Sequence, residues 1–91
     1  MPTRRTVFFI SDRTGITAEM LGNSLLTQFE DFQFRRITVP FIDSPEKVED
    51  VIRQVNETGV AEGRRPIVFS SVVDEIASET IRARAEALTL D

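Results

Sequence analysis

VFFISDRTGITAEMLGNSL, residues 7–25, combines a strand pattern, a polar loop and a helix pattern within one short segment. Its first four residues, Val7 to Ile10, are apolar and bounded by turn formers, which is typical of a buried strand in a parallel sheet. The polar run Ser11 to Gly15 follows, and apolar residues then recur at helical spacing as far as Phe29. We therefore predict a strand, a short loop and a helix over Thr14 to Phe29.

The polar loop carries groups that suit a negatively charged ligand. Three hydroxyls lie near the start of the expected helix, a glycine permits close approach of the backbone, and an arginine adds positive charge. Free N–H groups and the helix dipole favour an anion at such a position. The candidate residues are Ser11, Asp12, Arg13, Thr14, Gly15 and Thr17.

A structural role for this loop is the alternative, with Thr14 as an N-cap and Asp12 bonding its own turn. The loop is neither of two well-known phosphate-binding motifs. The chain contains no G-x-x-x-x-G-K-[ST] and no G-x-G-x-x-G.

Composition narrows the function classes. Ninety-one residues, 41% apolar and 29% charged, suit one small globular domain. The net charge of −4 argues against nucleic acid and anionic membranes as partners. The absence of a bilayer-spanning apolar run and of a signal peptide predicts a cytoplasmic location. Without cysteine or histidine, disulfides, ordinary zinc sites and a Ser-His-Asp triad are excluded, so we assign no metal ligand, and any acid–base chemistry would fall to carboxylates or to Lys47.

Strand and helix signals continue along the chain. Phe34–Ile42 has the pattern of a second strand, and mixed polarity and Pro40 indicate that it is less buried than the first and ends at the proline. Ser44-Pro45 combines an N-cap serine with a proline suited to the first helical position, so a second helix begins there. Gly59 is expected to end it, ahead of a loop over 60–65. Its apolar stripe consists of Val48, Val51, Ile52 and Val55.

The last third of the chain predicts another strand and helix. Pro66–Phe69 has the pattern of a buried strand, and Ser71-x-x-Asp74 has the form of a capping box. The helix that follows carries Ile76, Ala77, Ile81, Ala85 and Leu88.

Core positions follow from the same patterns. In the first helix, Gly22 is expected on a buried face with Ala18, Leu21 and Leu25, where a glycine suits close packing on the sheet. The phenylalanines predicted to lie in the core are Phe8, Phe9, Phe29, Phe34, Phe41 and Phe69.

The order β-α-β-α-β-α predicts an α/β fold with a three-stranded parallel sheet and helices on both faces. The two most apolar strands, the first and third, are expected to be neighbours, which gives the strand order 2-1-3 of a Rossmann- or flavodoxin-like half. Ligands of such sheets bind where the crossover direction reverses, beyond the carboxyl ends of the strands. Ser70 and Ser71 are therefore expected to join the first loop in one anion or phosphate site.

Three arginine pairs, Arg4-Arg5, Arg35-Arg36 and Arg64-Arg65, each precede an expected strand. They are predicted to gather at the amino rim, as solvated residues paired with Glu and Asp. Docking of a partner protein is the other role considered for them. The third strand is left as an apolar edge, which predicts a further paired strand, a second copy of the chain or a larger protein.

These residues resemble a known family. Residues 7–19, VFFISDRTGITAE, with Gln28-Phe29, are similar to the amino-terminal signature of the phosphoenolpyruvate synthase regulatory proteins, relatives of the plant pyruvate, phosphate dikinase regulatory proteins. The segments 38–41 (TVPF) and 66–70 (PIVFS) are similar to the family in the expected order. The Ile-Thr pair after Gly15 looks more like the synthase branch.

The resemblance implies a bifunctional enzyme. It uses ADP to phosphorylate a threonine of its target, phosphoenolpyruvate synthase or pyruvate, phosphate dikinase, and removes that phosphate with inorganic phosphate, releasing pyrophosphate. The family's P-loop lies in a carboxyl-terminal domain that residues 1–91 do not contain, so the resemblance carries no catalytic residue over to this chain. The resemblance therefore implies a single amino-terminal domain over residues 1–91, with no cofactor of its own, inactive alone and in contact with its carboxyl-terminal domain.

Two other functions are considered. In the first, the chain is a non-catalytic module that docks the target through the amino-rim arginines or an exposed helix face. In the second, it is a self-standing flavodoxin- or receiver-like anion-binding domain. Asp12 provides one receiver-type acid, but no lysine follows the third strand, which argues against the receiver.

Overall fold

A computed structural model describes residues 3–29 and 32–90 of the chain. In chain order its elements are β1 (Thr3–Ile10), α1 (Ile16–Leu26), β2 (Phe32–Val39), α2 (Pro45–Glu62), β3 (Ile67–Ser70), α3 (Glu75–Arg84) and β4 (Leu88–Leu90). The predicted α/β class and the alternation of strands and helices are confirmed.

The described strands form one parallel sheet in the order β2-β1-β3-β4. The predicted neighbours are correct, but the prediction of three strands is wrong because Leu88–Leu90 forms a fourth. Helix α3 ends at Arg84, Ala85 turns into an extended conformation, and the Leu88 N–H donates to the Pro66 carbonyl at 2.9 Å. Pairing with β3 thus takes Leu88 out of the helix in which we expected it.

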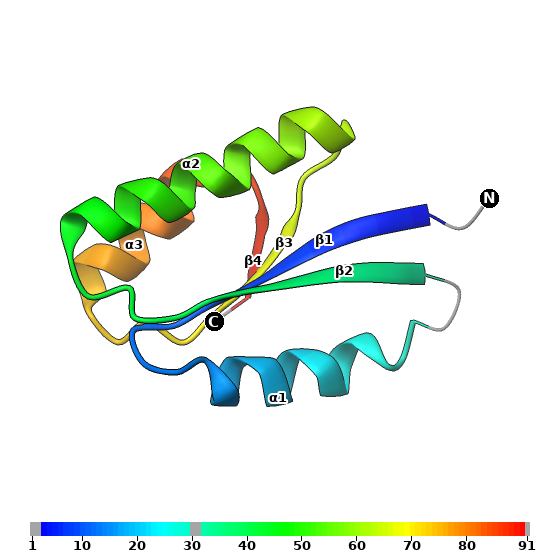
Figure 1. Cartoon of the computed structure of the whole chain (residues 1–91), viewed down its shortest axis with the longest axis horizontal. Helices are drawn as coiled ribbons and strands as arrows, with labels where there is room; N and C mark the ends of the chain where they lie inside the picture. The colour runs from blue at the N-terminus through cyan, green and yellow to red at the C-terminus, as the bar shows by residue number, and fades with distance from the viewer. Residues whose placement is uncertain (1–2, 30–31, 91) are drawn as a thin grey trace.

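The helices cover both faces, as predicted. Figure 1 shows α1 on one side of the sheet and α2 with α3 on the other. Helix α1 connects β1 to β2, its neighbour on one side. Helix α2 connects β2 to β3 and helix α3 connects β3 to β4, and both of these connections run across the sheet in the opposite direction. Right-handed crossovers then require opposite faces for the two sets of helices.

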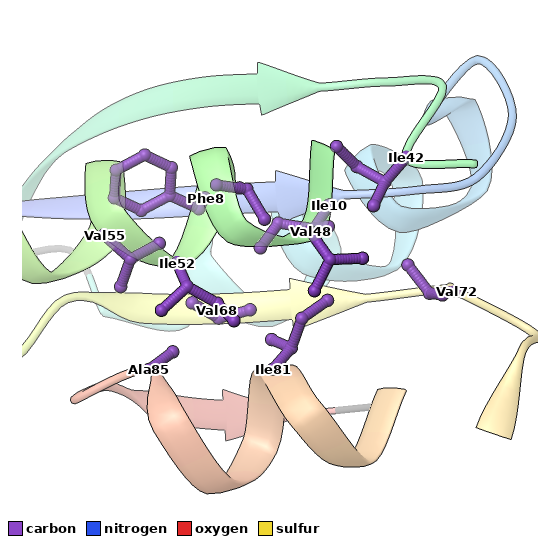
Figure 2. Close-up of a cluster of buried hydrophobic side chains, with 11 residues drawn as sticks. Phe8, Ile10, Ile42, Val48, Ile52, Val55, Val68, Val72, Ile81 and Ala85 are labelled. Carbon is purple, nitrogen blue, oxygen red and sulfur yellow. The ribbon is translucent and has the colours of Figure 1, made fainter. Parts of the chain in front are cut away.

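The side chains of β1 alternate between two cores. Phe8 and Ile10 pack under α2 and α3, in the cluster drawn in Figure 2, whereas Val7 and Phe9 pack under α1 with Phe69. These four residues, Val7 to Ile10, are at most 1% exposed, as expected for a central strand of a sheet that is covered on both sides. The larger cluster consists of Phe8, Ile10, Ile42, Val48, Val51, Ile52, Val55, Val68, Val72, Ile81 and Ala85.

Helix α1 packs on only part of the predicted stripe. Ala18, Gly22 and Leu26 are its buried residues, while Leu21 and Leu25 are 64% and 48% exposed. A Cβ on Gly22 would lie 2.3 Å from Cε1 of Phe9, so the smallest residues face the sheet and the leucines turn outward. The close approach predicted for Gly22 is confirmed, and the burial of Leu21 and Leu25 is wrong.

Several element ends also differ. Helix α1 starts after Gly15, at φ 88°, and no side chain caps it, so the capping role considered for Thr14 is wrong. Helix α2 begins at Ser44-Pro45 as predicted, with Ser44 Oγ accepting from the Lys47 N–H at 3.3 Å. It runs past Gly59 to Glu62, because Gly63 adopts the left-handed conformation, at φ 73°, that ends a helix.

Two of the expected core phenylalanines lie outside the core. Phe29 and Phe41 are each 53% exposed, beyond the ends of α1 and β2 respectively. The second strand ends at Val39, directly before Pro40, as that proline predicted, and it does not reach Ile42. Phe41 has φ 61°.

Candidate functional site

The two serine-bearing turns lie side by side at the carboxyl rim of the sheet. Ile10 and Ser70 are partners in the register of β1 and β3, and the Ser71 N–H donates to the Ile10 carbonyl at 2.9 Å. This adjacency is the geometry predicted from the strand order.

Ser11 is held inside its own loop. It is 3% exposed, and its Oγ accepts from the Arg13 N–H at 3.0 Å. Its backbone N–H donates to the carbonyl of Val39, the last residue of β2, at 3.1 Å, and its carbonyl accepts from the Ile42 N–H, in the turn after β2, at 2.9 Å. Ser11 therefore joins the first loop to the second strand.

Asp12 joins the first loop to the third. Its Oδ2 accepts from the Val73 N–H at 3.0 Å, across 61 positions of sequence. Helix α3 begins after Val73, with Asp74 as its N-cap, whose side chain accepts from the Ala77 N–H at 3.2 Å. The capping box predicted to begin at Ser71 is therefore wrong by three residues.

The remaining candidates differ in exposure. Arg13, Thr14 and Thr17 are exposed, whereas Gly15 is buried. Ser70 and Ser71 are half-buried, and Ser70 Oγ accepts from the Val72 N–H at 3.4 Å.

A cavity of about 540 Å³ opens at this rim, on the side of α2 and α3. Of the predicted candidates, only Asp12 and Arg13 line it, while Ser70 and Ser71 line a separate groove on the α1 side. The structure thus divides the predicted site between the two faces of the sheet. The cavity is lined by Asp12, Arg13, Ile42, Asp43, Ser44, Pro45, Val48, Glu49, Asp74, Ile76, Ala77 and Thr80.

Sequence reasoning missed most of this lining. It assigned Ser44 only to an N-cap and Asp74 only to a capping box, and it counted Ile76, which is 77% exposed, among the apolar residues of the third helix. The signal that finds these residues is topological. Helices α2 and α3 both begin at the carboxyl rim on the same face, so their first turns border one hollow.

Four carboxylates and one arginine line the cavity, and every carboxylate is engaged. Asp12 and Asp74 accept from backbone N–H groups, as described above. A 2.8 Å hydrogen bond from Lys47 and its charge lower the pKa of Asp43. The pKa of Glu49 is also lowered, chiefly by its hydrogen bond from Arg84. Arg13 remains as the positive side chain that faces the cavity.

Two arginines of the three pairs, Arg5 and Arg36, bond differently from the prediction. Arg5 donates to the Arg65 carbonyl at 3.0 and 2.8 Å, and Arg36 donates to the Asn23 amide oxygen at 2.7 Å. These acceptors are not the expected carboxylates. Arg36 pairs with Val7 in mid-strand, because β2 begins at Phe32. The side chain of Arg4 lies outside the described residues.

Known proteins match nearly the whole chain. A sequence model of the family described as kinase/pyrophosphorylase matches residues 7–91. The chain belongs to the kinase/pyrophosphorylase family. The resemblance stated from the sequence is thereby confirmed.

Several curated relatives share the name "Putative phosphoenolpyruvate synthase regulatory protein". The one from Aromatoleum aromaticum is 60% identical over 70 residues, which are 77% of this chain and 25% of the relative. The one from Janthinobacterium sp. (strain Marseille) is 54% identical over 78 residues, 86% of this chain and 27% of the relative. The one from Laribacter hongkongensis is 46% identical over all 91 residues and 33% of the relative.

This member of the kinase/pyrophosphorylase family thus spans about a third or less of the length of these relatives. Among the helices of the described residues, none has the length and apolarity needed to cross a bilayer. Within residues 3–29 and 32–90, no three Asp or Glu side chains gather in a way that would hold a metal ion.

Proposed function

We propose that this chain is the amino-terminal domain of a regulatory protein that inactivates and reactivates phosphoenolpyruvate synthase. In this proposal the whole protein transfers phosphate from ADP to a threonine of the synthase, and inorganic phosphate removes it again as pyrophosphate. The observation that carries the proposal is the family match over residues 7–91, together with the name shared by the relatives.

We assign binding rather than catalysis to this domain. Its 91 residues contain no P-loop motif, no histidine and no cysteine. The family's chemistry then lies in residues outside this chain. Mixed with phosphoenolpyruvate synthase and ADP, the chain alone is expected to transfer no phosphate, and phosphothreonine formed under these conditions would contradict the assignment.

The carboxyl rim is the proposed ligand site of the domain. Arg13 faces a cavity whose floor includes Ile42 and Val48, and the first turns of α2 and α3 border it. Lys47 and Arg84 offset the charges of Asp43 and Glu49 in this lining, so an apolar floor beside Arg13 and two helix starts suits a ligand that combines a flat apolar ring with phosphate, such as ADP. Inorganic phosphate is the smaller ligand that the same groups would bind.

Titration with phosphate, pyrophosphate and ADP, monitored through backbone amide chemical shifts, tests this site. We expect shifts in residues 11–17, 42–44 and 74–77 for ADP. Shifts confined to residues 70–71 and α1 would instead place the ligand in the groove on the other face. If none of the three compounds moves any of these amides, the site is disproved.

Arg13→Gln is the matched variant for this titration, and Arg64→Gln is its control at the opposite rim. Both side chains are exposed, so neither change is expected to disturb the core. The first substitution should weaken binding of the phosphate-bearing ligands about tenfold, as expected for loss of one charge-assisted hydrogen bond. The control should leave binding unchanged.

Docking of the target protein through the amino rim is the second candidate function. Arg64 and Arg65 are exposed there, beside a hollow that they line together with Gly63. Capture of phosphoenolpyruvate synthase by this chain, lost in the double variant Arg64→Glu with Arg65→Glu but kept in Arg13→Glu, would support it. Capture that survives the double variant would exclude these arginines as the docking surface.

A further inference from the structure

Helix α1 leaves a row of leucines uncovered on its side of the sheet. Leu21 and Leu25 are 64% and 48% exposed, and Leu88 and Leu90 of β4 are 41% and 49% exposed. Between the helix and β4 lies a groove of about 310 Å³, with Phe69 among its lining residues. Ser24, Ser70 and Ser71 are its polar lining.

Strand register shows that β4 takes part in this surface. Leu90 pairs with Phe69, and Leu88 pairs with Ile67. Phe69 and Ile67 pack in the cluster under α1, and paired residues on neighbouring strands point to the same face. Leu88 and Leu90 therefore point to the α1 side, where the groove separates them from the helix.

The uncovered area has the width of one helix. Neighbouring strands lie about 4.8 Å apart and a helix with its side chains is about 10 Å wide, so four strands take roughly two helices on each face. Two helices, α2 and α3, cover one face, and α1 alone covers the other within the described residues (Figure 1).

We propose that this groove docks one amphipathic helix from the part of the protein that follows position 91 in the longer relatives. The Laribacter hongkongensis relative aligns with all 91 residues and uses only 33% of its own length to do so. The remaining two thirds belong to the same polypeptide, which makes them an occupant at high local concentration.

The direction of the crossovers restricts which helix this is. A right-handed connection from β4 to a further strand beside it would run in the same direction as those through α2 and α3, and would place its helix on their face. The occupant of the groove is therefore a helix in a connection that runs from the β4 side of the sheet towards the β2 side, the direction in which α1 connects β1 to β2. Its apolar residues are expected at i, i+3, i+4 and i+7, facing Leu25 and Leu90.

Cysteine accessibility tests the proposal, because the chain has no cysteine of its own. Leu25→Cys places a thiol in the groove. Met20→Cys is the matched control on the same helix, since Met20 is 69% exposed and does not line the groove. Each variant is made in the 91-residue chain and in the L. hongkongensis relative whose matched first third is replaced by residues 1–91.

Alkylation rates of these thiols, measured peptide by peptide by mass spectrometry, give the readout. In the long protein we expect the Leu25→Cys thiol to react at least tenfold more slowly than in the 91-residue chain, and the Met20→Cys thiol to react equally fast in both. Equal rates for Leu25→Cys in the two proteins would overturn the proposal. Slow reaction in the short chain, with a dimer seen by sedimentation, would assign the groove to a second copy instead.

A second measurement covers the case in which the chimera does not fold. The same two cysteines are then placed at the aligned positions of the intact L. hongkongensis relative, and their alkylation is compared before and after proteolytic removal of the segment beyond the matched third. Protection only at the position aligned with Leu25, lost on removal, is the expected result. The readout does not involve phosphate transfer, so it can fail while the proposed function stands, and the reverse is equally true.

Discussion

Phe41 is a bulky residue with a backbone conformation that ordinarily favours glycine. Its φ is 61°, its ring is 53% exposed, and its N–H donates to the Arg13 carbonyl at 2.8 Å. The neighbouring Ile42 N–H donates to Ser11, so two successive bonds hold this turn against the first loop. The left-handed conformation of a residue with a Cβ costs of the order of 1–2 kcal/mol, which the surrounding bonds must offset.

Substitution of Phe41 measures that cost. Phe41→Gly and Phe41→Ala both remove the ring, and only the second retains a Cβ. We therefore expect the glycine variant to be more stable by about 1 kcal/mol in urea unfolding. Val60, which is 81% exposed within α2, provides the control, because there the alanine variant is expected to be more stable than the glycine variant by about 1 kcal/mol. The same sign at both positions would show that Phe41 carries no strain.

At the scale of elements, the contact between α1 and the sheet depends on the missing side chain of Gly22. A Cβ there would lie 2.3 Å from Cε1 of Phe9 and 3.0 Å from Cδ2 of Phe69. The two rings stack on each other with centroids 5.7 Å apart, so neither can move without disturbing the other. Helix α1 is also tied to β2 by the bonds Arg36 to Asn23 and Thr38 to Glu19.

Gly22→Ala is expected to destabilise the fold despite the better helix propensity of alanine. The propensity gain is about 1 kcal/mol, and overpacking of a tight core costs about 1–3 kcal/mol. The net expectation is a loss of about 1 kcal/mol in the free energy of unfolding. Ser24→Ala, at an exposed position of the same helix, should be neutral or slightly stabilising. A Gly22→Ala variant as stable as the Ser24→Ala variant would contradict the close packing.

The α2–α3 pair has its own electrostatic link, between Glu49 and Arg84. This bond lowers the pKa of Glu49 in the folded state, so the ionised carboxylate stabilises the fold. The stabilisation is complete above the ordinary glutamate pKa and is lost as the pH falls through the lowered value. Both side chains are about half exposed, so the effect is modest and weakens in salt.

Glu49→Gln tests this link through the pH dependence of stability. Between about pH 7 and pH 3, the wild-type chain is expected to lose more of its unfolding free energy than the variant does, because the variant has no carboxylate to protonate. In about 1 M salt the two curves should converge. Glu57→Gln, an exposed position on the same helix, is the control and should follow the wild-type curve. Parallel curves for Glu49→Gln and wild type at low salt would exclude the link.

At the scale of the whole molecule, sequence patterns predicted the arrangement of strands better than the contacts of helices. The apolar runs of β1 and β3 identify the two central strands, and connection rules then place both serine turns at one rim. The short strand Leu88–Leu90 escapes periodicity analysis because three residues are too few for a period, and only pairing with β3 decides between strand and helix. The exposure of Leu21 and Leu25 escapes it because their hydrophobicity favours burial, whereas the space above Phe9 admits only a residue as small as Gly22.

The candidate site shows the same division. Adjacency of the first and third loops follows from topology, and the structure shows it in the bond between Ser71 and Ile10. The side on which each loop presents its side chains depends on local hydrogen bonds, such as that between Asp12 and Val73, which no sequence spacing reveals. As a result four of the predicted residues, Asp12 and Arg13 on one face and Ser70 and Ser71 on the other, are divided between two hollows, and the caps of α2 and α3 line the first of them.

The position of β1 between β2 and β3 also affects how the chain folds during its synthesis. Val7 pairs with Arg36 on one side and with Ile67 on the other. The edge of β1 that pairs with β3 therefore stays unpaired until about 60 more residues have been translated. At the usual elongation rates of about 5–20 residues per second, that wait is roughly 3–12 s. Until then the nascent VFFI segment has one open edge at the ribosome, where a chaperone is expected to bind it.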